Sequence, residues 1–293
     1  MSIHCPYCRL CSEDDRHLPT PIKIGYFRRH CDQRFLQRFK CAACRKSFSL
    51  ATFDKCFRQR KRTVNFKLRN LLASGCSQRR AAFLLNINRK TVVRKFLFLG
   101  QFAMAQMNFQ KFDPSTPKYI QFDELETFEH TKCKPLSVLL AIEEKTRRIL
   151  YFDVARMPAK GLLAKKSFKK YGWRPDERGP SREFVFRNLN LIALKDTRIK
   201  TDKNPHYVND IKRYLPSFKH ETTKGQRGAI TGQGELKKIG FDPLFSLNHT
   251  CAMFRANINR LCRKTWCTTK KPDRLLLHIA IYAVFHNTVL IRK

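Results

Sequence analysis

Two pairs of cysteines near the start of the chain constrain its fold more than any other feature. They are Cys5-Pro-Tyr-Cys8 and Cys41-Ala-Ala-Cys44. Because a two-residue gap lets both thiolates of a tight turn point at one ion, the two pairs together make a tetrahedral sulfur site suited to Zn²⁺. The pattern predicts a zinc ribbon over residues 1–56, with these four cysteines as ligands. Buried free cysteines are the alternative, and Cys11 or Cys31 could replace one of the four.

The cysteines are expected to be reduced. The first residues, Met1-Ser-Ile-His-Cys5, contain neither a basic leader nor an apolar segment, so a cytoplasmic location is predicted. Reduced cysteines bind metals, take part in catalysis or fill a core, and do not form a disulfide framework. The longest apolar stretch, 275–291, is interrupted by polar residues, so no transmembrane helix is expected. A ribbon this small buries little core, and we expect loss of the metal to unfold it.

The charge of the chain indicates a polyanionic partner. Lys and Arg number 60 and Asp and Glu number 23, which gives a net charge of +37. The commonest partner of such a positive field is the phosphate backbone of DNA or RNA. Hydrophobic residues make up 42% of the chain and include 24 Phe, which is enough to bury a core and excludes a disordered basic tail.

Residues 57–112 have the pattern of a helix-turn-helix domain. Leu68, Leu71 and Leu72 share one helical face, Gly75 ends that helix, and Ser77 begins a second one. A tight turn at 86–88 leads into a third helix, whose first residues would face the major groove of duplex DNA. The candidate DNA contacts are Arg79, Arg80, Arg89, Lys90, Thr91, Arg94 and Lys95. A helical hairpin with a basic face is the alternative.

After a linker at 113–117 the pattern changes to that of β-strands. Residues 119–123, 136–143 and 149–154 predict three consecutive strands in a meander, and a helix is expected at about 181–194.

Two acids are expected to meet at the edge of this sheet. Asp123 ends the first predicted strand, and Asp202 follows residues 197–201. Two carboxylates brought together would bind Mg²⁺ through oxygen, and a metal pair could activate water and stabilise a leaving oxygen. Each Asp taken singly could instead belong to a surface turn or a helix cap.

The order of these motifs resembles that of the DDE-class transposases of bacterial insertion sequences, in particular the small-element group. In that group a zinc ribbon and a helix-turn-helix precede an RNase H-like catalytic domain. Three segments carry the resemblance: Phe122-Asp-Glu-Leu-Glu-Thr127, Lys200-Thr-Asp-Lys-Asn-Pro-His-Tyr207, and Asn248-His-Thr-Cys-Ala-Met-Phe-Arg255 with its continuation to Cys267. The resemblance covers nearly the whole chain.

The resemblance implies an α/β fold, in which an RNase H-like mixed five-stranded sheet with flanking helices occupies 113–293. It implies hydrolysis that depends on Mg²⁺ or Mn²⁺ and exposes a 3′-OH at each element end, followed by attack of that 3′-OH on target DNA. Asp123 and Asp202 would hold the metals. The third position, where many relatives have Glu, is Asn248, whose amide oxygen can bind a hard cation but brings no charge. Glu235 is the rival third acid, and Glu221 is a more distant one.

Several residues near the third segment are assigned supporting roles. Cations that would bind phosphates near the site are Arg255, Arg260, Arg263 and Lys264. Trp266, Cys262 and Cys267 are expected in the core. His206 and His249 could position a water or a phosphate, or simply bond their own loops.

Double-stranded DNA, as element ends and as target, is the expected partner, with no membrane. The resemblance also implies a homo-oligomer, at least a dimer on DNA. Two alternatives remain: a DNA-binding regulator that uses only the ribbon and the helix-turn-helix, and an inactive transposase relative that binds without cutting.

Overall fold

The computed structural model describes residues 3–8, 20–109, 116–224, 242–262 and 265–291. The chain divides into two compact units, Met1–Lys67 and Leu68–Lys293. Helix α1 (Val64–Leu72) spans the boundary between them.

The first unit is a three-stranded antiparallel sheet. Its strands are β1 (Ile22–Arg28), β2 (Phe35–Lys40) and β3 (Ser47–Ser49), in that spatial order, and a 3₁₀ turn follows at Leu50–Phe53. The small core consists of Phe39 and Phe48, stacked with ring centroids 5.5 Å apart, together with the buried Cys5 and Cys41. This core is small, and the expected dependence of the unit on a metal stays a prediction.

Two further helices follow α1 in the second unit. Helix α2 (Gln78–Leu84) begins at Ser77, whose side chain accepts a hydrogen bond from the backbone N–H of Arg80, and α3 (Arg89–Phe109) follows a short turn. In that turn Asn86 has a φ of +46°, and the Asn88 side chain accepts from the Lys90 N–H at 2.8 Å. These caps explain why both helices start where the sequence predicts.

A five-stranded mixed sheet lies in the second unit, with spatial order β6-β5-β4-β7-β8. The strands are β4 (Tyr119–Phe128), β5 (Pro135–Glu143), β6 (Ile149–Arg156), β7 (Arg198–Asp202) and β8 (Lys219–Thr223). Strands β4, β5 and β6 form the predicted antiparallel meander, and β7 and β8 add in parallel to β4. The structure confirms a mixed α/β architecture with a five-stranded sheet and flanking helices.

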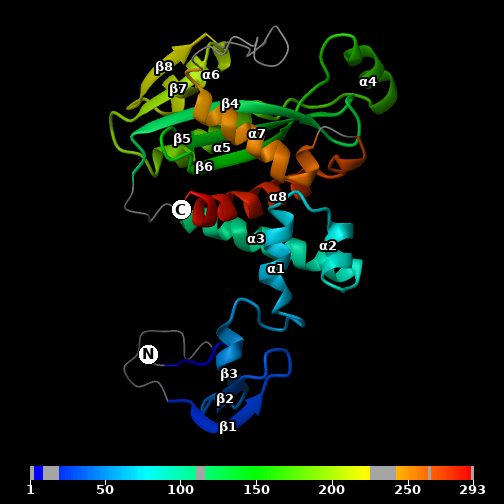
Figure 1. The fold of residues 1–293 in the computed structure, drawn as a ribbon. Helices are drawn as coiled ribbons and strands as arrows, with labels where there is room; N and C mark the ends of the chain where they lie inside the picture. Colours follow the sequence, from blue (N-terminus) through cyan, green and yellow to red (C-terminus); the bar gives the residue numbers. More distant parts are fainter. Residues whose placement is uncertain (1–2, 9–19, 110–115, 225–241, 263–264, 292–293) are drawn as a thin grey trace. The chain divides into compact units, whose positions relative to one another are not determined.

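Helices pack on both faces of this sheet (Figure 1). They are α5 (Arg178–Asn190), α6 (Pro205–Tyr214), α7 (Phe245–Asn257) and α8 (Pro272–Phe285). Helix α4 (Leu163–Tyr171) lies beside one end of the sheet. The chain also has 3₁₀ turns at Asn259–Leu261 and Thr265–Cys267 and a π-helical turn at His286–Leu290.

The alternation of side chains along β4 shows which helices cover each face of the sheet. Phe122 contacts Phe186 of α5 and Tyr207 of α6, with ring centroids 4.7 and 5.1 Å apart. The neighbouring Gln121 bonds instead to the segment that begins α7. Since side chains alternate across a sheet, α5 and α6 cover one face and α7 the other.

Helix α3 packs closely along α8. At Gly100, an added Cβ would lie 2.6 Å from the Leu277 Cβ, so only glycine permits this approach. His278 of α8 lies edge-on to Phe96 of α3 and makes a 2.9 Å hydrogen bond to the Leu72 carbonyl. The helices assigned by sequence to DNA binding therefore share one compact unit with the sheet.

Two expectations about local structure are wrong. Strand β4 does not end at Asp123, because its pairing with β5 continues to Phe128. Trp266 does not pack in the core, since 76% of its surface is exposed. Among the described residues, no helix is long and apolar enough to span a membrane.

Candidate functional site

Asp123 and Asp202 lie level with each other on neighbouring strands. In the parallel register of β4 and β7, Tyr119 lies opposite Arg198 and Gln121 opposite Lys200. Continuing that register by two residues places Asp123 beside Asp202, the last residue of β7. Both side chains therefore leave the sheet on the face covered by α7. The sequence expected two acids to meet at the edge of the sheet; the register places them on neighbouring strands where the shorter strand, β7, ends, and their joint role stays a prediction.

Two donors hold one oxygen of Asp123. Its Oδ1 accepts a hydrogen bond from the Glu124 backbone N–H at 2.7 Å and from the Tyr207 hydroxyl at 3.2 Å. Burial is the main reason that the pKa of Asp123 rises to about 6. The charge of Asp202 also raises this pKa, whereas the two hydrogen bonds lower it. The carboxyl is thus fixed in orientation, and its ionised form is unfavourable.

The two acids, Asp123 and Asp202, are not salt-bridged within the part of the chain that the structure describes, although the chain contains 60 Lys and Arg residues. Asp202 is bonded through its Oδ1 to the Asn204 N–H at 3.0 Å. Carboxylate oxygens that repel each other suit a divalent cation such as Mg²⁺, which would remove the repulsion.

Gln121 fixes the start of α7 beside this pair. Its side-chain oxygen accepts from the Leu247 N–H at 2.9 Å, and its amide donates to the Pro243 carbonyl at 3.1 Å. Gln121 is buried two residues before Asp123 and on the same face. One turn further along α7, Cys251 is close enough to Asp123 that the carboxylate contributes, after burial, to raising the pKa of this thiol to about 12.

Asn248 lies on the same face of α7 as Cys251, three residues earlier. Its amide donates a 2.7 Å hydrogen bond to Oδ2 of Asp242, and its backbone N–H bonds to the Leu244 carbonyl. The amide oxygen remains available to a cation. Asp242 also accepts from the Leu244 N–H at 2.9 Å, in the turn that precedes the helix.

Asp242 is an acid that the sequence analysis did not consider, and it bonds to Asn248. It stands next to Asn248, whereas Glu235 lies outside the described residues and Glu221 pairs with Arg198 at 3.2 Å. Its signal in the sequence is an Asp three residues before the start of a helix. No three acids converge within 4.8 Å in the part of the chain that the structure describes.

A buried ionic network lies on the opposite face and holds α6 in place. Arg182 of α5 donates to Oε1 of Glu124 at 3.0 Å and to Oδ2 of Asp210 at 2.5 Å. The second oxygen of Glu124 accepts from the Ser137 hydroxyl at 2.8 Å. Asp210 lies one turn after Tyr207 in α6, so the network fixes the helix that supplies the hydroxyl to Asp123.

In the ribbon, three of the four predicted zinc ligands come together. The sulfur atoms of Cys5, Cys41 and Cys44 all lie within 4.8 Å of one another. Cys8 packs against the same cluster, and Cys31 lies in the turn after β1, while Cys11 is outside the described residues. The Cys44 N–H lies 3.4 Å from the Cys41 sulfur and is the main reason that the pKa of Cys41 falls to about 7. The environment therefore favours the thiolate of Cys41, whereas burial and the neighbouring Cys41 and Cys5 sulfurs raise the pKa of Cys44 to about 11.

The predicted DNA contacts of α2 and α3 differ in exposure. Arg79, Arg80, Arg89, Lys90 and Arg94 are exposed, and Thr91 is half-buried. Lys95, by contrast, has only 5% of its surface exposed, so it is less accessible to DNA than the other residues of the set.

The cations near α7 are also unequal. Arg255 is half-buried, whereas the Arg260 guanidinium lies 5.3 Å from the Phe96 ring and burial lowers its pKa to about 10. Arg263 and Lys264 lie outside the described residues. His249 bonds to the Arg147 guanidinium at 3.0 Å, and His206 is exposed at the start of α6.

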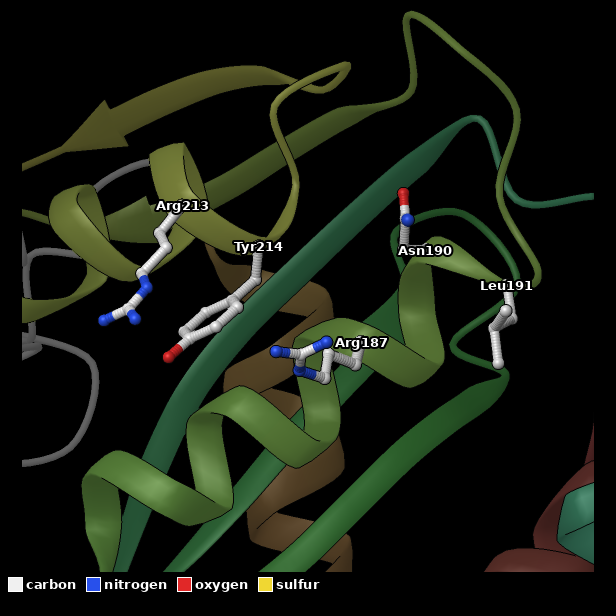
Figure 2. Close-up of a pocket in the computed structure, with 5 residues that line it drawn as sticks. All are labelled: Arg187, Asn190, Leu191, Arg213 and Tyr214. Carbon is white, nitrogen blue, oxygen red and sulfur yellow. The ribbon is translucent and has the colours of Figure 1, made fainter.

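A basic pocket of about 460 Å³ lies where the C-terminal ends of α5 and α6 meet, away from Asp123. Figure 2 shows the Tyr214 ring beside two guanidinium groups, with Asn190 and Leu191 completing the lining. The Arg187 and Arg213 guanidinium carbons are 5.4 and 5.3 Å from the ring centroid. The Tyr214 hydroxyl donates to Glu183, which also accepts from Arg187. Two of the polar groups of the pocket are therefore already hydrogen-bonded to this neighbouring carboxylate.

Comparison with known proteins identifies no family. No family model matches the chain, and no curated protein matches it. Among solved structures, the chain is 10% identical to a chain of the simian T-cell lymphotropic virus intasome bound to PP2A regulatory subunit B56 gamma, with a TM-score of 0.24. That alignment covers 74% of this chain but 65% of the other, less than two thirds of its length.

Two Mos1 structures are similar to the same low degree. In the Mos1 strand transfer complex the identity is 11%, the coverage 78% of both chains and the TM-score 0.24. For the catalytic domain of Mos1 mariner transposase the values are 10%, 64% of this chain and 94% of the other, and 0.22. TM-scores of this size do not establish a shared fold, so the functional argument depends on the site itself.

Proposed function

We propose that the chain is a DNA transposase of the DDE class, which binds the ends of its insertion sequence and catalyses metal-dependent strand cleavage and strand transfer. The observation that carries this proposal is the pair of level carboxylates Asp123 and Asp202 in a protein of net charge +37. The charge of Asp202 disfavours ionisation of Asp123, and a bound divalent cation would relieve that repulsion.

Each residue at the site has a role in this reaction. Asp123 and Asp202 would hold Mg²⁺ or Mn²⁺, with the Asn248 amide oxygen or Asp242 as a third ligand. The bound metal would activate the attacking oxygen and stabilise the leaving oxygen of the phosphodiester. Tyr207 holds Oδ1 of Asp123, and Oδ2 would be the oxygen that binds the metal. The exposed arginines of α2 and α3 would bind DNA phosphates, and Zn²⁺ would be held in the ribbon.

The purified protein tests the proposal on a duplex that carries the ends flanking its own gene, with Mg²⁺ or Mn²⁺. We expect the wild type to cut and join these ends, and we expect Asp123→Asn and Asp202→Asn to bind them without cutting. Asn248→Ala and Asp242→Asn are compared to find which of the two supplies the third ligand. Asp196→Asn is the matched control, because Asp196 is an exposed acid paired with Lys219 away from the site.

Binding without cleavage by the wild type, with either metal, would contradict the proposed chemistry. It would favour the inactive relative or the DNA-binding regulator. Cleavage by both Asp variants at the rate of the Asp196 control would mean that the reaction occurs elsewhere in the chain.

A further inference from the structure

The hairpin of β1 and β2 presents two aromatic rings on a strongly basic surface. Tyr26 is 68% exposed and Phe35 is 71% exposed. All seven residues of β1 are exposed, so these rings lie outside the ribbon core. Exposed large aromatic side chains that gather on one face of a small unit indicate a binding surface.

The register of the hairpin places both rings on one face. Tyr26 lies opposite Gln37, and Arg28 lies opposite Phe35. Tyr26 and Arg28 are two residues apart, as are Phe35 and Gln37, so these four side chains form one face, which we call the hairpin face. Diagonal neighbours on such a ribbon are about 7–8 Å apart, which gives each ring room to stack with a separate planar group.

Hydrogen bonds and an ion pair brace the turn and the bulge of the hairpin. Backbone bonds of 2.8 Å join Arg29 to Arg34 and Gln33 to Arg29 across the turn, and Arg29 also forms an ion pair with Asp32. The Gln37 amide donates to the Gly25 carbonyl at 2.8 Å, which fixes the bulge in β1. A preformed surface loses little entropy when it binds a ligand.

Charge identifies the ligand as a polyanion. Residues 20–67 contain 14 Lys and Arg and two acids, Asp32 and Asp54, a net charge of 14 − 2 = +12. Both acids are already paired, with Arg29 and Arg62. Arg28 itself lies over the Phe35 ring, with its guanidinium carbon 6.0 Å from the centroid. A second copy of the chain would be repelled, and the bulge at Gly25 (φ +94°) disfavours pairing of a peptide strand along β1.

We propose that the hairpin face binds single-stranded nucleic acid by stacking unpaired bases on Tyr26 and Phe35, while neighbouring cations contact the phosphates. Aromatic rings stack on base faces, and these faces are free only in unpaired strands because a duplex covers them with neighbouring bases. This site is separate from the duplex contacts assigned to α2 and α3, and it does not depend on the proposed catalytic activity.

Fluorescence anisotropy of the zinc-loaded, full-length protein with a labelled 12-nucleotide single strand tests this inference. We expect Tyr26→Ala and Phe35→Ala each to weaken binding by roughly tenfold, and Tyr26→Phe and Phe35→Tyr to keep it. The matched control is Phe27→Ala, since Phe27 belongs to the same strand but pairs with Leu36 on the opposite face. Zinc content and circular dichroism establish that each variant is folded.

Three further ligands separate stacking from charge. An abasic strand of equal length should bind more weakly to the wild type and be insensitive to the Ala variants, whereas a duplex should bind the wild type and the Ala variants equally. DNA and RNA strands of the same sequence show which sugar the face prefers. The inference is overturned if the wild type does not bind the single strand, if the abasic strand binds as tightly, or if Phe27→Ala weakens binding as much as Tyr26→Ala.

Discussion

Replacing Asp123 with Asn should stabilise the protein while abolishing metal-dependent cleavage. The pKa of Asp123 rises from 3.8 to about 6 on folding, because burial and the charge of Asp202 disfavour the carboxylate. At about 1.4 kcal/mol per pKa unit, the ionised carboxylate costs on the order of 3 kcal/mol at pH 7. An Asn oxygen could still accept the hydrogen bonds from Tyr207 and from the Glu124 N–H.

The pH dependence follows from the direction of this shift. Below pH 3.8 the carboxyl is protonated in both the folded and the unfolded state, so its ionisation does not change the free energy of unfolding. Between pH 3.8 and 6 the unfolded state ionises first, so the free energy of unfolding of the wild type falls as the pH rises. The advantage of Asp123→Asn should therefore be small at pH 4, grow up to about pH 6 and stay constant above it.

Thermal unfolding without divalent metal, measured from pH 4 to pH 8, checks this prediction. At pH 7 we expect the variant to melt roughly 6–12 °C above the wild type, at about 2–4 °C per kcal/mol for a unit of this size. Added Mg²⁺ should narrow the gap by stabilising only the wild type, by about 2.7 kcal/mol at 100 times its Kd. A variant that is less stable than the wild type at pH 7, or a difference that does not depend on pH, would refute the reasoning.

Three other changes test separate parts of the structure. Cys41→Ser should abolish zinc binding and remove hydrogen-exchange protection from residues 22–49 while leaving β4 and β5 protected; equal loss in both would contradict a metal-dependent ribbon. Gly100→Ala should cost about 1–3 kcal/mol in denaturant unfolding because its Cβ meets Leu277, and adding Leu277→Ala should restore part of that loss; simple additivity would argue against the close helix contact. Arg182→Met should cost about 3–5 kcal/mol by leaving two carboxylates unpaired, and a neutral result would mean that they remain solvated.

The strands of the sheet could be predicted from sequence because they depend on local patterns of apolar residues. The run of apolar residues in β5 reads directly as a strand buried on both faces, and it is buried along its length. Asp123 was expected to end its strand, because polar residues follow it. In the structure those residues continue the strand, since Glu124 finds Arg182 and Ser137 as buried partners.

Other site features depend on contacts between distant segments. The position of Asp242 depends on Gln121, which bonds to the adjacent Pro243 across more than a hundred residues, and no local pattern reports this. The burial of Lys95, by contrast, could have been predicted from a local pattern. Val92, Lys95, Phe96 and Leu99 form an i, i+3, i+4, i+7 stripe, and the position in that stripe outweighs the charge.

Because α3 packs closely on α8, the number of residues between this contact and the start of α3 determines which way the basic first turn of α3 faces. The helix carries Arg89 and Lys90 at its first turn and is held at Gly100 against Leu277. Each residue of an α-helix adds 100° of rotation and 1.5 Å of rise. A single residue inserted between these points would turn the basic end through about 100° relative to the sheet. Insertions in this segment should be tolerated only in groups of about seven residues, which restore the phase after two full turns.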